Sequence, residues 1–334
     1  MRPLTLWKNA AATLTAPFLS ALLLGAGFLA FVAWDQSHWW QIKEDYHFGW
    51  LVPVMAGYVV HIRWAEVQAA LAACAREGSL RASGWQKWLL RVVVSSMLLF
   101  GALMFLLGSF YRAGAGTSQP GTLAITLGAV AIVLPLLLVN APESPAPAVG
   151  NIFADARVQL VILFTFPVLV WLVSAPLVSA IETQVNLFLL HKVVGVVAFV
   201  FVDVLGLPIE QQGNVLVLPT GSVGVEDACS GIHSLTASLF AGSFLAAVSL
   251  DRLRKKIALV VSSCGLVFGA NLARSLFLTG WAYHRGPRAI EGTVHDVAGY
   301  AVMALTFVGL LGLVWLFNLK LLPRGAHPVA EAQS

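Results

Sequence analysis

Residues 121–139 have the sequence GTLAITLGAVAIVLPLLLV, nineteen positions without a single charged side chain. A helix that crosses the hydrocarbon core of a bilayer needs about 20 mostly apolar residues. The rest of the chain has the same character, because 58% of its 334 residues are hydrophobic and only 11% are charged. Soluble domains carry about 25% charged residues, so this composition excludes a water-soluble globule. The sequence predicts a polytopic membrane protein.

Seven further segments are long and apolar enough to cross a bilayer, namely 13–34, 47–64, 89–110, 158–178, 229–250, 256–281 and 296–319. We therefore expect an all-α bundle of about eight transmembrane helices. The first helix follows Arg2 and Lys8 and has no small-residue cleavage site, which indicates an uncleaved anchor. The second is the shortest, because His47, His61 and Arg63 crowd its ends.

Basic residues orient this bundle, because cytoplasmic loops carry an excess of Lys and Arg. If the N-terminus is cytoplasmic and the spans alternate, fourteen of the twenty Lys and Arg residues lie on the inner side and six on the outer side. The short loop 251–256, with the sequence DRLRKK, contributes most to this difference. We expect both termini in the cytoplasm.

The long outer segment 179–228 separates spans five and six. Its first part, 181–205, is apolar enough to resemble a ninth span, but it carries several polar residues, Glu182 and Asp203 among them. A ninth span would also move the basic loop 251–256 to the outer side. We therefore expect an amphipathic helix that lies in the outer interface, followed by a short hairpin at 215–225.

The domain organisation follows from a stretch rich in proline and alanine. Residues 141–157 are predicted to form a cytoplasmic linker. This linker divides an N-terminal four-span half, 1–140, from a C-terminal four-span core, 158–320, and a cytoplasmic tail, 321–334, completes the chain. A net charge of +4 is too small to indicate a nucleic-acid-binding protein, so the expected surroundings are the lipid bilayer. The spacing of Cys74, Cys229 and Cys264 indicates neither a disulfide framework nor a zinc site, and no metal or organic cofactor is implied.

Candidate chemistry gathers at the outer ends of spans six, seven and eight, where Cys229, Arg274 and His295 are expected at a similar depth. A rise of about 1.5 Å per residue from Lys256 places Arg274 roughly 27 Å up span seven, just inside the outer boundary. Cys229 stands at a helix N-terminus, which favours the nucleophilic thiolate. The alternative is a small packing residue, and the neighbouring carboxylates of residues 226 and 227 disfavour a thiolate.

Arg274 and Asn271 lie on one face of span seven, because they are three residues apart. An arginine inside a span usually faces a partner, a cavity or a substrate, and Arg274 could donate to a developing oxyanion. The alternative is that it reaches the outer headgroups. Asn271 could orient Arg274 or contact a peptide backbone, although a hydrogen bond between helices is its simpler role.

Two histidines could serve as the general acid and base. His295 titrates near neutrality when unperturbed, although it could equally be an interfacial residue at the start of span eight. Asp296 is adjacent to it and does not share its helical face, so we expect Asp296 to cap the helix. His233 is a rival base, because it lies four residues after Cys229 on the same face.

These residues together resemble the exosortase/archaeosortase family. The resemblance rests on residues 227–235, DACSGIHSL, then on Asn271-Leu272-Ala273-Arg274, and then on His295 with Gly299. It extends weakly to residues 45–53, DYHFGWLVP, before the second span. Many relatives carry arginine where this chain has His233, which leaves the role of that position open.

The resemblance implies an integral-membrane cysteine peptidase that acts as a transpeptidase. Its catalytic residues would be Cys229 as the nucleophile, Arg274 as the oxyanion stabiliser and His295 as the general acid and base. The implied substrates are exported proteins with a C-terminal signal: a short motif such as Pro-Glu-Pro, one transmembrane helix and a basic tail. The implied reaction passes through a thioester to an amine acceptor, and the family is linked to exopolysaccharide production in Gram-negative bacteria, hence to the inner membrane.

Three alternatives belong to other functional classes. A transporter would place polar residues deep in several spans, and spans one, three and four contain almost none. A non-catalytic scaffold for polysaccharide export would tolerate Cys229→Ala. A thiol-redox protein needs a second cysteine near Cys229, and the sequence around it has none.

Overall fold

The computed structural model describes residues 14–76, 84–143, 152, 155–224 and 231–319. Nearly all of this part of the chain is helical. In chain order, its helices are α2 (Ala16–Ile42), η1 (Glu44–Leu51), α3 (Val52–Ile62), α4 (Trp64–Arg76), α5 (Gly84–Ala115), α6 (Gln119–Asn140), α7 (Ala156–Val173), α8 (Ser179–Phe199), η3 (Val200–Val204), α9 (Gly231–Ser249), α10 (Leu253–Arg285), η4 (Pro287–Ile290) and α11 (Thr293–Asn318).

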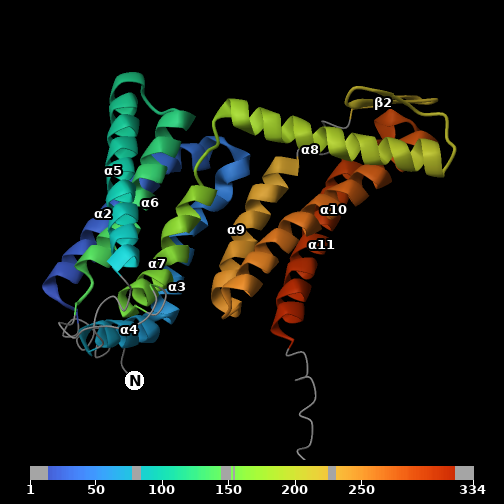
Figure 1. Cartoon of the computed structure of the whole chain (residues 1–334). Coiled ribbons are helices and arrows are strands. Elements are labelled where there is room, and N and C mark those ends of the chain that lie inside the picture. Colours follow the sequence, from blue (N-terminus) through green and yellow to red (C-terminus); the bar gives the residue numbers. More distant parts are fainter. Residues whose placement is uncertain (1–13, 77–83, 144–151, 153–154, 225–230, 320–334) are drawn as a thin grey trace, which may run out of the picture.

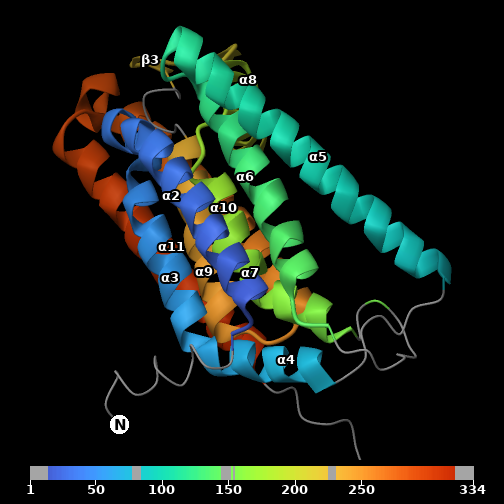
Figure 2. The ribbon, with the colours of Figure 1, turned by 90° about the vertical axis from the view of Figure 1, so that its left-hand side faces the viewer.

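The long helices alternate in direction through one bundle (Figures 1 and 2). Helix α2 begins near the end marked N, and α11 finishes at the same end. Seven segments of the described residues are long and apolar enough to cross a membrane: α2, α5, α6, α7, Ser179–Val204, α10 and α11. Helix α9 runs beside α10 and has a shorter apolar stretch, Ser234–Ser249. The predicted all-α, polytopic architecture is confirmed.

The predicted second span, 47–64, differs from the observed structure. Its residues are divided between η1 and α3, and α3 has only 11 residues. At about 1.5 Å per residue it is roughly 16 Å long, which is shorter than a hydrocarbon core of about 30 Å. Arg63 ends α3 and donates a hydrogen bond to the Ala247 carbonyl of α9. The chain then turns into α4, which lies across the N-marked end of the bundle (Figure 2).

Helix α8 does not run with the other helices but lies across the ends of α9, α10 and α11 (Figure 1). Its buried side chains recur every three or four residues, as in Leu190, Val193, Val194 and Val197. They form one core with residues of α10 and α11, among them Leu278. The opposite side combines polar residues with large exposed apolar ones. The transverse direction agrees with the predicted interfacial helix, and its position in the interface remains a prediction.

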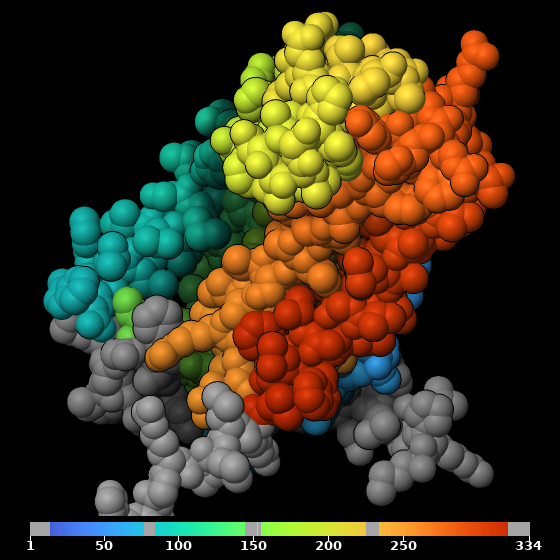
Figure 3. Space-filling model, turned by 90° about the vertical axis from the view of Figure 1, so that its right-hand side faces the viewer, coloured from blue at the N-terminus to red at the C-terminus, as the bar shows by residue number. Residues whose placement is uncertain are grey.

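A small antiparallel sheet follows α8, with the strand order β1 (Glu210–Gln212), β2 (Val215–Leu218) and β3 (Gly221–Gly224). The predicted hairpin corresponds to β2 and β3, whereas β1 was not expected. Gly213 permits the first tight turn, because its φ of 63° favours glycine. Leu216 and Val223 join the core of α8. Figure 3 shows this region (yellow) seated over the upper part of α10 (orange).

Helices α5 and α6 approach so closely that their backbones touch at glycines seven residues apart on each helix. A Cβ at Gly101 would lie 2.9 Å from the Gly128 carbonyl oxygen, and one at Gly108 would lie 2.8 Å from that of Gly121. A Cβ at Gly128 would overlap the backbone of Phe105. Small residues at a helix interface are the usual basis of close packing in membranes.

Helix α7 packs with the N-terminal helices, although it follows the predicted linker 141–157, most of which lies outside the described residues. Its Leu160 and Phe164 share a core with Phe18 of α2. Buried polar bonds reinforce this packing near its upper end. The Gln36 side chain donates to the Trp171 carbonyl oxygen at 3.1 Å and accepts a hydrogen bond from the Ser174 hydroxyl at 2.8 Å.

Candidate active site

Arg274, in the second half of α10, meets His295, in the first turn of α11. The distance from Arg274 Nη2 to His295 Nε2 is 2.9 Å. His295 lies in the first turn of α11, and Gly299 is one turn further along the same face. A Cβ at Gly299 would stand 3.7 Å from Arg274 Nη2, so the guanidinium group lies directly against this face of α11. The structure thus brings two of the three predicted catalytic residues together.

This contact fixes the form of the imidazole. A guanidinium group is always charged in proteins and has donors but no acceptor. His295 Nε2 must therefore accept the hydrogen bond, which requires a neutral ring with its proton on Nδ1. In this form His295 can take a proton but has none to give from Nε2. The resting geometry suits a general base.

A second donor of the same guanidinium group, Nε, is buried without a partner among the described residues. Leaving a buried charged donor unsatisfied is costly, and such donors at functional sites often await a ligand oxygen. Within the described part of the chain, Arg274 therefore combines a positive charge with an N–H group that has no acceptor, as expected of a group that stabilises an anion.

Asn271 lies one helical turn before Arg274 and is 6% exposed. The backbone carbonyl oxygen of Asn271 accepts a hydrogen bond from the Ser275 hydroxyl at 3.0 Å. Asn271 also lines an otherwise apolar pocket between α8, α9 and α10, together with Leu189, Leu190, Val193, Leu235, Val267 and Phe268. The expected shared face with Arg274 holds. The role of Asn271 in orienting Arg274 remains a prediction.

The predicted nucleophile, Cys229, lies outside the described residues, as do Glu226, Asp227 and the side chain of His233. Helix α9 begins at Gly231, two positions after Cys229 in the sequence. Its direction takes it down between the N-terminal helices and α10 (Figure 1).

The segment η1 packs against α9, an arrangement that the sequence analysis missed. Thr236 donates a hydrogen bond to the Asp45 carbonyl oxygen at 3.4 Å. The rings of Phe48 and Phe240 stack with centroids 5.1 Å apart. The weak resemblance at residues 45–53 was the signal that could have found it. Through η1, the N-terminal half of the chain contacts the helix that follows Cys229.

Asp296 does not cap α11, contrary to the prediction. The cap residue is Gly292, and the backbone N–H of Asp296 donates to its carbonyl oxygen at 3.1 Å. The helix starts at Thr293, earlier than the predicted span, so Asp296 falls within the first turn. A carboxylate there still interacts favourably with the helix dipole.

The remaining cysteines do not join the candidate site. Cys74 is buried in the core of the N-terminal helices, and Cys264 is half-buried on α10. Within the described ranges, no three His, Cys, Asp or Glu side chains gather as a metal site would require.

Comparison with known protein families assigns the chain to a family. A model of the transmembrane exosortase family matches residues 39–312, which include η1, Arg274 and His295. No curated protein and no solved structure matches the chain. Because the family match covers well over half of the sequence, this multi-pass membrane protein belongs to the transmembrane exosortase family.

Proposed function

We propose that the protein is a membrane cysteine peptidase and transpeptidase that removes the C-terminal sorting signal of exported proteins. Membership of the exosortase family supports the class of reaction. The single observation that carries the proposal is the 2.9 Å contact between Arg274 and His295, which joins a potential anion stabiliser to a potential base. Cys229 supplies the nucleophile in this proposal.

The first half of the reaction forms a thioester. The Cys229 thiol gives its proton to His295 Nε2, and the thiolate attacks the scissile carbonyl carbon. Protonated Nε2 is no longer an acceptor, so it releases the Arg274 guanidinium. Arg274 is then free to donate to the new oxyanion, where such a donor is worth about 10²–10³ in rate. His295 next protonates the leaving amine, and the peptide bond breaks.

The second half transfers the exported protein. An amine acceptor loses its proton to His295 Nε2 and attacks the thioester carbonyl, and the released thiolate recovers that proton. Water would give the free acid by the same route. A site beside the bilayer limits access of water, which favours the amine.

The expected orientation puts this site on the outer face of the inner membrane, with both termini cytoplasmic. The exposed basic residues Arg252 and Arg254 support it, because they lie at the opposite end of α10 from Arg274. A substrate whose tail is a transmembrane helix would present its cleavage site at the depth of Arg274. Exopolysaccharide-linked surface sorting is the expected setting.

The decisive experiment follows substrate processing in cells. A tagged exported protein with a Pro-Glu-Pro motif, a helix and a basic tail is co-expressed with the wild type, Cys229→Ala, Arg274→Ala or His295→Ala. We expect loss of the tail with the wild type only, at equal membrane levels. Arg285→Ala is the matched control, because Arg285 is exposed on the same helix and stacks on Trp281.

The mass of the product separates the possible outcomes. A product heavier than the free acid indicates transfer to an acceptor, whereas the free acid indicates hydrolysis. Equal processing by Cys229→Ala and the wild type would exclude the cysteine mechanism and favour a non-catalytic scaffold.

No described contact favours the transporter alternative. The buried polar side chains near the upper end of α2 are bonded within the protein. Asp35 pairs with Arg112 of α5, and the Gln36 amide donates to Thr126 at 2.8 Å. These bonds hold helices together.

A further inference from the structure

We propose that the ion pair between Lys43 and Glu182 positions α8 against α10 and α11, the helices that carry Arg274 and His295. Both charges are then positioning residues for substrate binding. This inference rests on the proposed function, because it takes the substrate to bind where α8 packs against these two helices.

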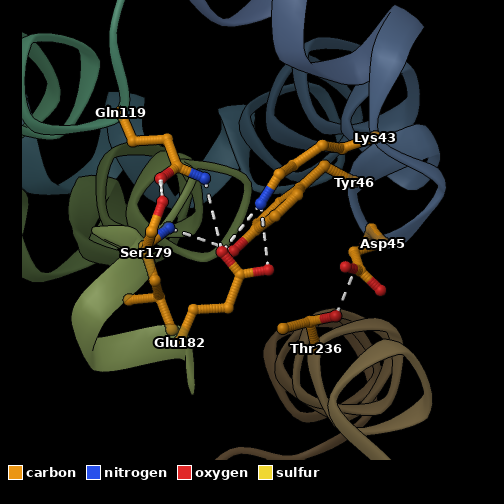
Figure 4. A network of polar contacts seen from close by, with 8 residues as sticks. Lys43, Asp45, Tyr46, Gln119, Ser179, Glu182 and Thr236 are labelled. Carbon is orange, nitrogen blue, oxygen red and sulfur yellow. Dashed lines mark hydrogen bonds and ion pairs between the residues drawn. The ribbon is translucent and has the colours of Figure 1, made fainter. Parts of the chain in front are cut away.

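The pair joins the N-terminal helices to the first turn of α8 (Figure 4). Lys43 is the residue at which α2 ends, and its Nζ lies 2.7 Å and 3.0 Å from the two carboxylate oxygens of Glu182. Gln119, at the start of α6, donates to the same carboxylate at 3.3 Å, and it accepts a hydrogen bond from Ser179. Three elements thus meet at the beginning of α8.

The pair is well placed to be stronger than an ordinary surface ion pair. The Lys43 and Glu182 side chains are only 28% and 17% exposed, so solvent screens them less than a fully exposed pair. Both carboxylate oxygens of Glu182 are engaged, which restricts its geometry. Glu182 also lies in the first turn of α8, where a negative charge interacts favourably with the helix dipole.

Residues of α2 and η1 also form hydrogen bonds with the turn between α7 and α8. The Trp40 indole N–H donates to the Ser174 carbonyl oxygen at 3.2 Å, and the Leu177 N–H donates to the Tyr46 hydroxyl at 3.0 Å. The end of α2 and the start of η1 therefore determine where α8 begins and in which direction it leaves.

Two walls of the apolar pocket between α8, α9 and α10 depend on the segment 43–46. Lys43 holds α8, whose Leu190 and Val193 line the pocket. Asp45 accepts a hydrogen bond from Thr236, the neighbour of the pocket residue Leu235 on α9. Figure 4 shows Lys43 and Asp45 directed toward these two helices. Val193 is eleven residues beyond Glu182, about 16 Å along the helix, so a small tilt at the start of α8 displaces the pocket wall.

The first test measures the position of α8 without any substrate. Val193 is 5% exposed, so a cysteine there is expected to resist a maleimide reagent. The variant Val193→Cys is made in a chain whose three native cysteines are replaced by alanine. Adding Lys43→Glu should raise the labelling rate about tenfold, and the double exchange Lys43→Glu with Glu182→Lys should restore protection, because it re-forms the pair in reverse.

The second test measures processing of the helical substrate in detergent. Lys43→Glu should raise KM about tenfold with kcat within about twofold, since a displaced α8 weakens substrate binding rather than the chemical step. The double exchange should recover most of the loss. Lys192→Glu is the matched control, because Lys192 is exposed on α8 and its ammonium group lies over the ring of Phe188 on the same helix.

The two tests separate this inference from the proposed function. Unchanged labelling of Val193→Cys after Lys43→Glu would overturn the positioning role even if processing is active. A fall in kcat alone, or no recovery in the double exchange, would also overturn it. A wild type that fails to process any substrate would count against the proposed function, while the labelling result would still decide the position of α8.

Discussion

Two antiparallel helix pairs in this protein are packed in opposite ways. Helices α5 and α6 touch through their backbones at the paired glycines, for example Gly108 against Gly121. Helices α10 and α11 instead meet, where one ends and the other begins, through the side chains of Arg274 and His295. The first pair places no side chain between its helices at these glycines. The second pair places two polar side chains there, and it carries the candidate chemistry.

The two helix pairs differ in the contacts that attach them to the bundle. Helices in lipid associate through close packing and hydrogen bonds between helices. Helix α5 is mostly exposed, because only Gly101 and Gly108 of it are buried. The glycine contacts, the packing of Phe105 on Phe28 and Phe31, and the ion pair from Arg112 to Asp35 attach it to α2 and α6. Helix α11 also has Gly309 against Leu266 of α10, so the pairing of α10 with α11 does not depend on His295 alone.

The largest expected effect comes from His295→Gln. The glutamine oxygen can still accept the Arg274 hydrogen bond, but it cannot transfer a proton. We expect processing to fall by about 10²–10⁴, the usual contribution of a general acid or base, with an unchanged melting temperature. Processing rates and thermal unfolding in detergent measure the two quantities.

The control for that variant is His284→Gln, since His284 is exposed near the end of α10. It should leave both quantities unchanged. If His295→Gln instead lowers stability and keeps activity, the α10–α11 contact is structural and the contrast with α5–α6 disappears.

The next effect comes from Gly128→Ala, which forces α5 and α6 apart because the added Cβ meets the backbone of Phe105. We expect a loss of about 1–3 kcal/mol of stability, as for overpacked cores, with normal processing per folded molecule. Gly114→Ala is the matched control, because a Cβ at Gly114 on α5 meets no described atom within 4 Å. Equal melting temperatures for the two variants would refute the backbone contact.

The smallest expected effect concerns the hydrogen bond between Tyr46 of η1 and Leu177, in the turn between α7 and α8. Burial raises the pKa of the Tyr46 hydroxyl above its ordinary 10.0; the bond from Leu177 opposes this rise, and the charge of Glu182 adds to it. A raised pKa stabilises the folded protein fully below pH 10, and this stabilisation is lost as the pH rises through the folded-state pKa.

Tyr46→Phe should therefore cost about 0.5–1.5 kcal/mol near pH 8 through the lost hydrogen bond, and the difference from the wild type should shrink above pH 10. Thermal unfolding at both pH values measures this. Tyr58→Phe, at an exposed position on α3, should show no such convergence. A constant difference for Tyr46→Phe would exclude titration of this hydroxyl.

Most of the fold could be predicted because apolar length alone determines the long helices. The span 121–139 became α6 almost unchanged, and Ser118 caps it by accepting from the Gly121 N–H. The prediction failed at 47–64, where Arg63 ends α3 and bonds to the Ala247 carbonyl. That contact joins residues far apart in sequence, so hydropathy could not reveal it.

The sequence could predict the level of the site residues along their helices, but not the contacts between their side chains. Counting residues along the helices placed Arg274 and His295 near the same level. Their hydrogen bond depends on how α10 and α11 are rotated about their axes, which packing determines. The contact of Asp45 with Thr236 depends on the fold of η1 against α9, for which the sequence offers only the weak resemblance at residues 45–53.

The transverse helix α8 and its sheet also determine the route of approach. Together they lie over the ends of the helices that carry Arg274 and His295 (Figures 1 and 3). A polypeptide that descends along the helix axes meets this layer first. Under the proposed function, a substrate segment that already resides in the bilayer would approach from the side instead. Confinement to two dimensions would then act as a filter, because a soluble peptide with the same motif would have to pass this layer.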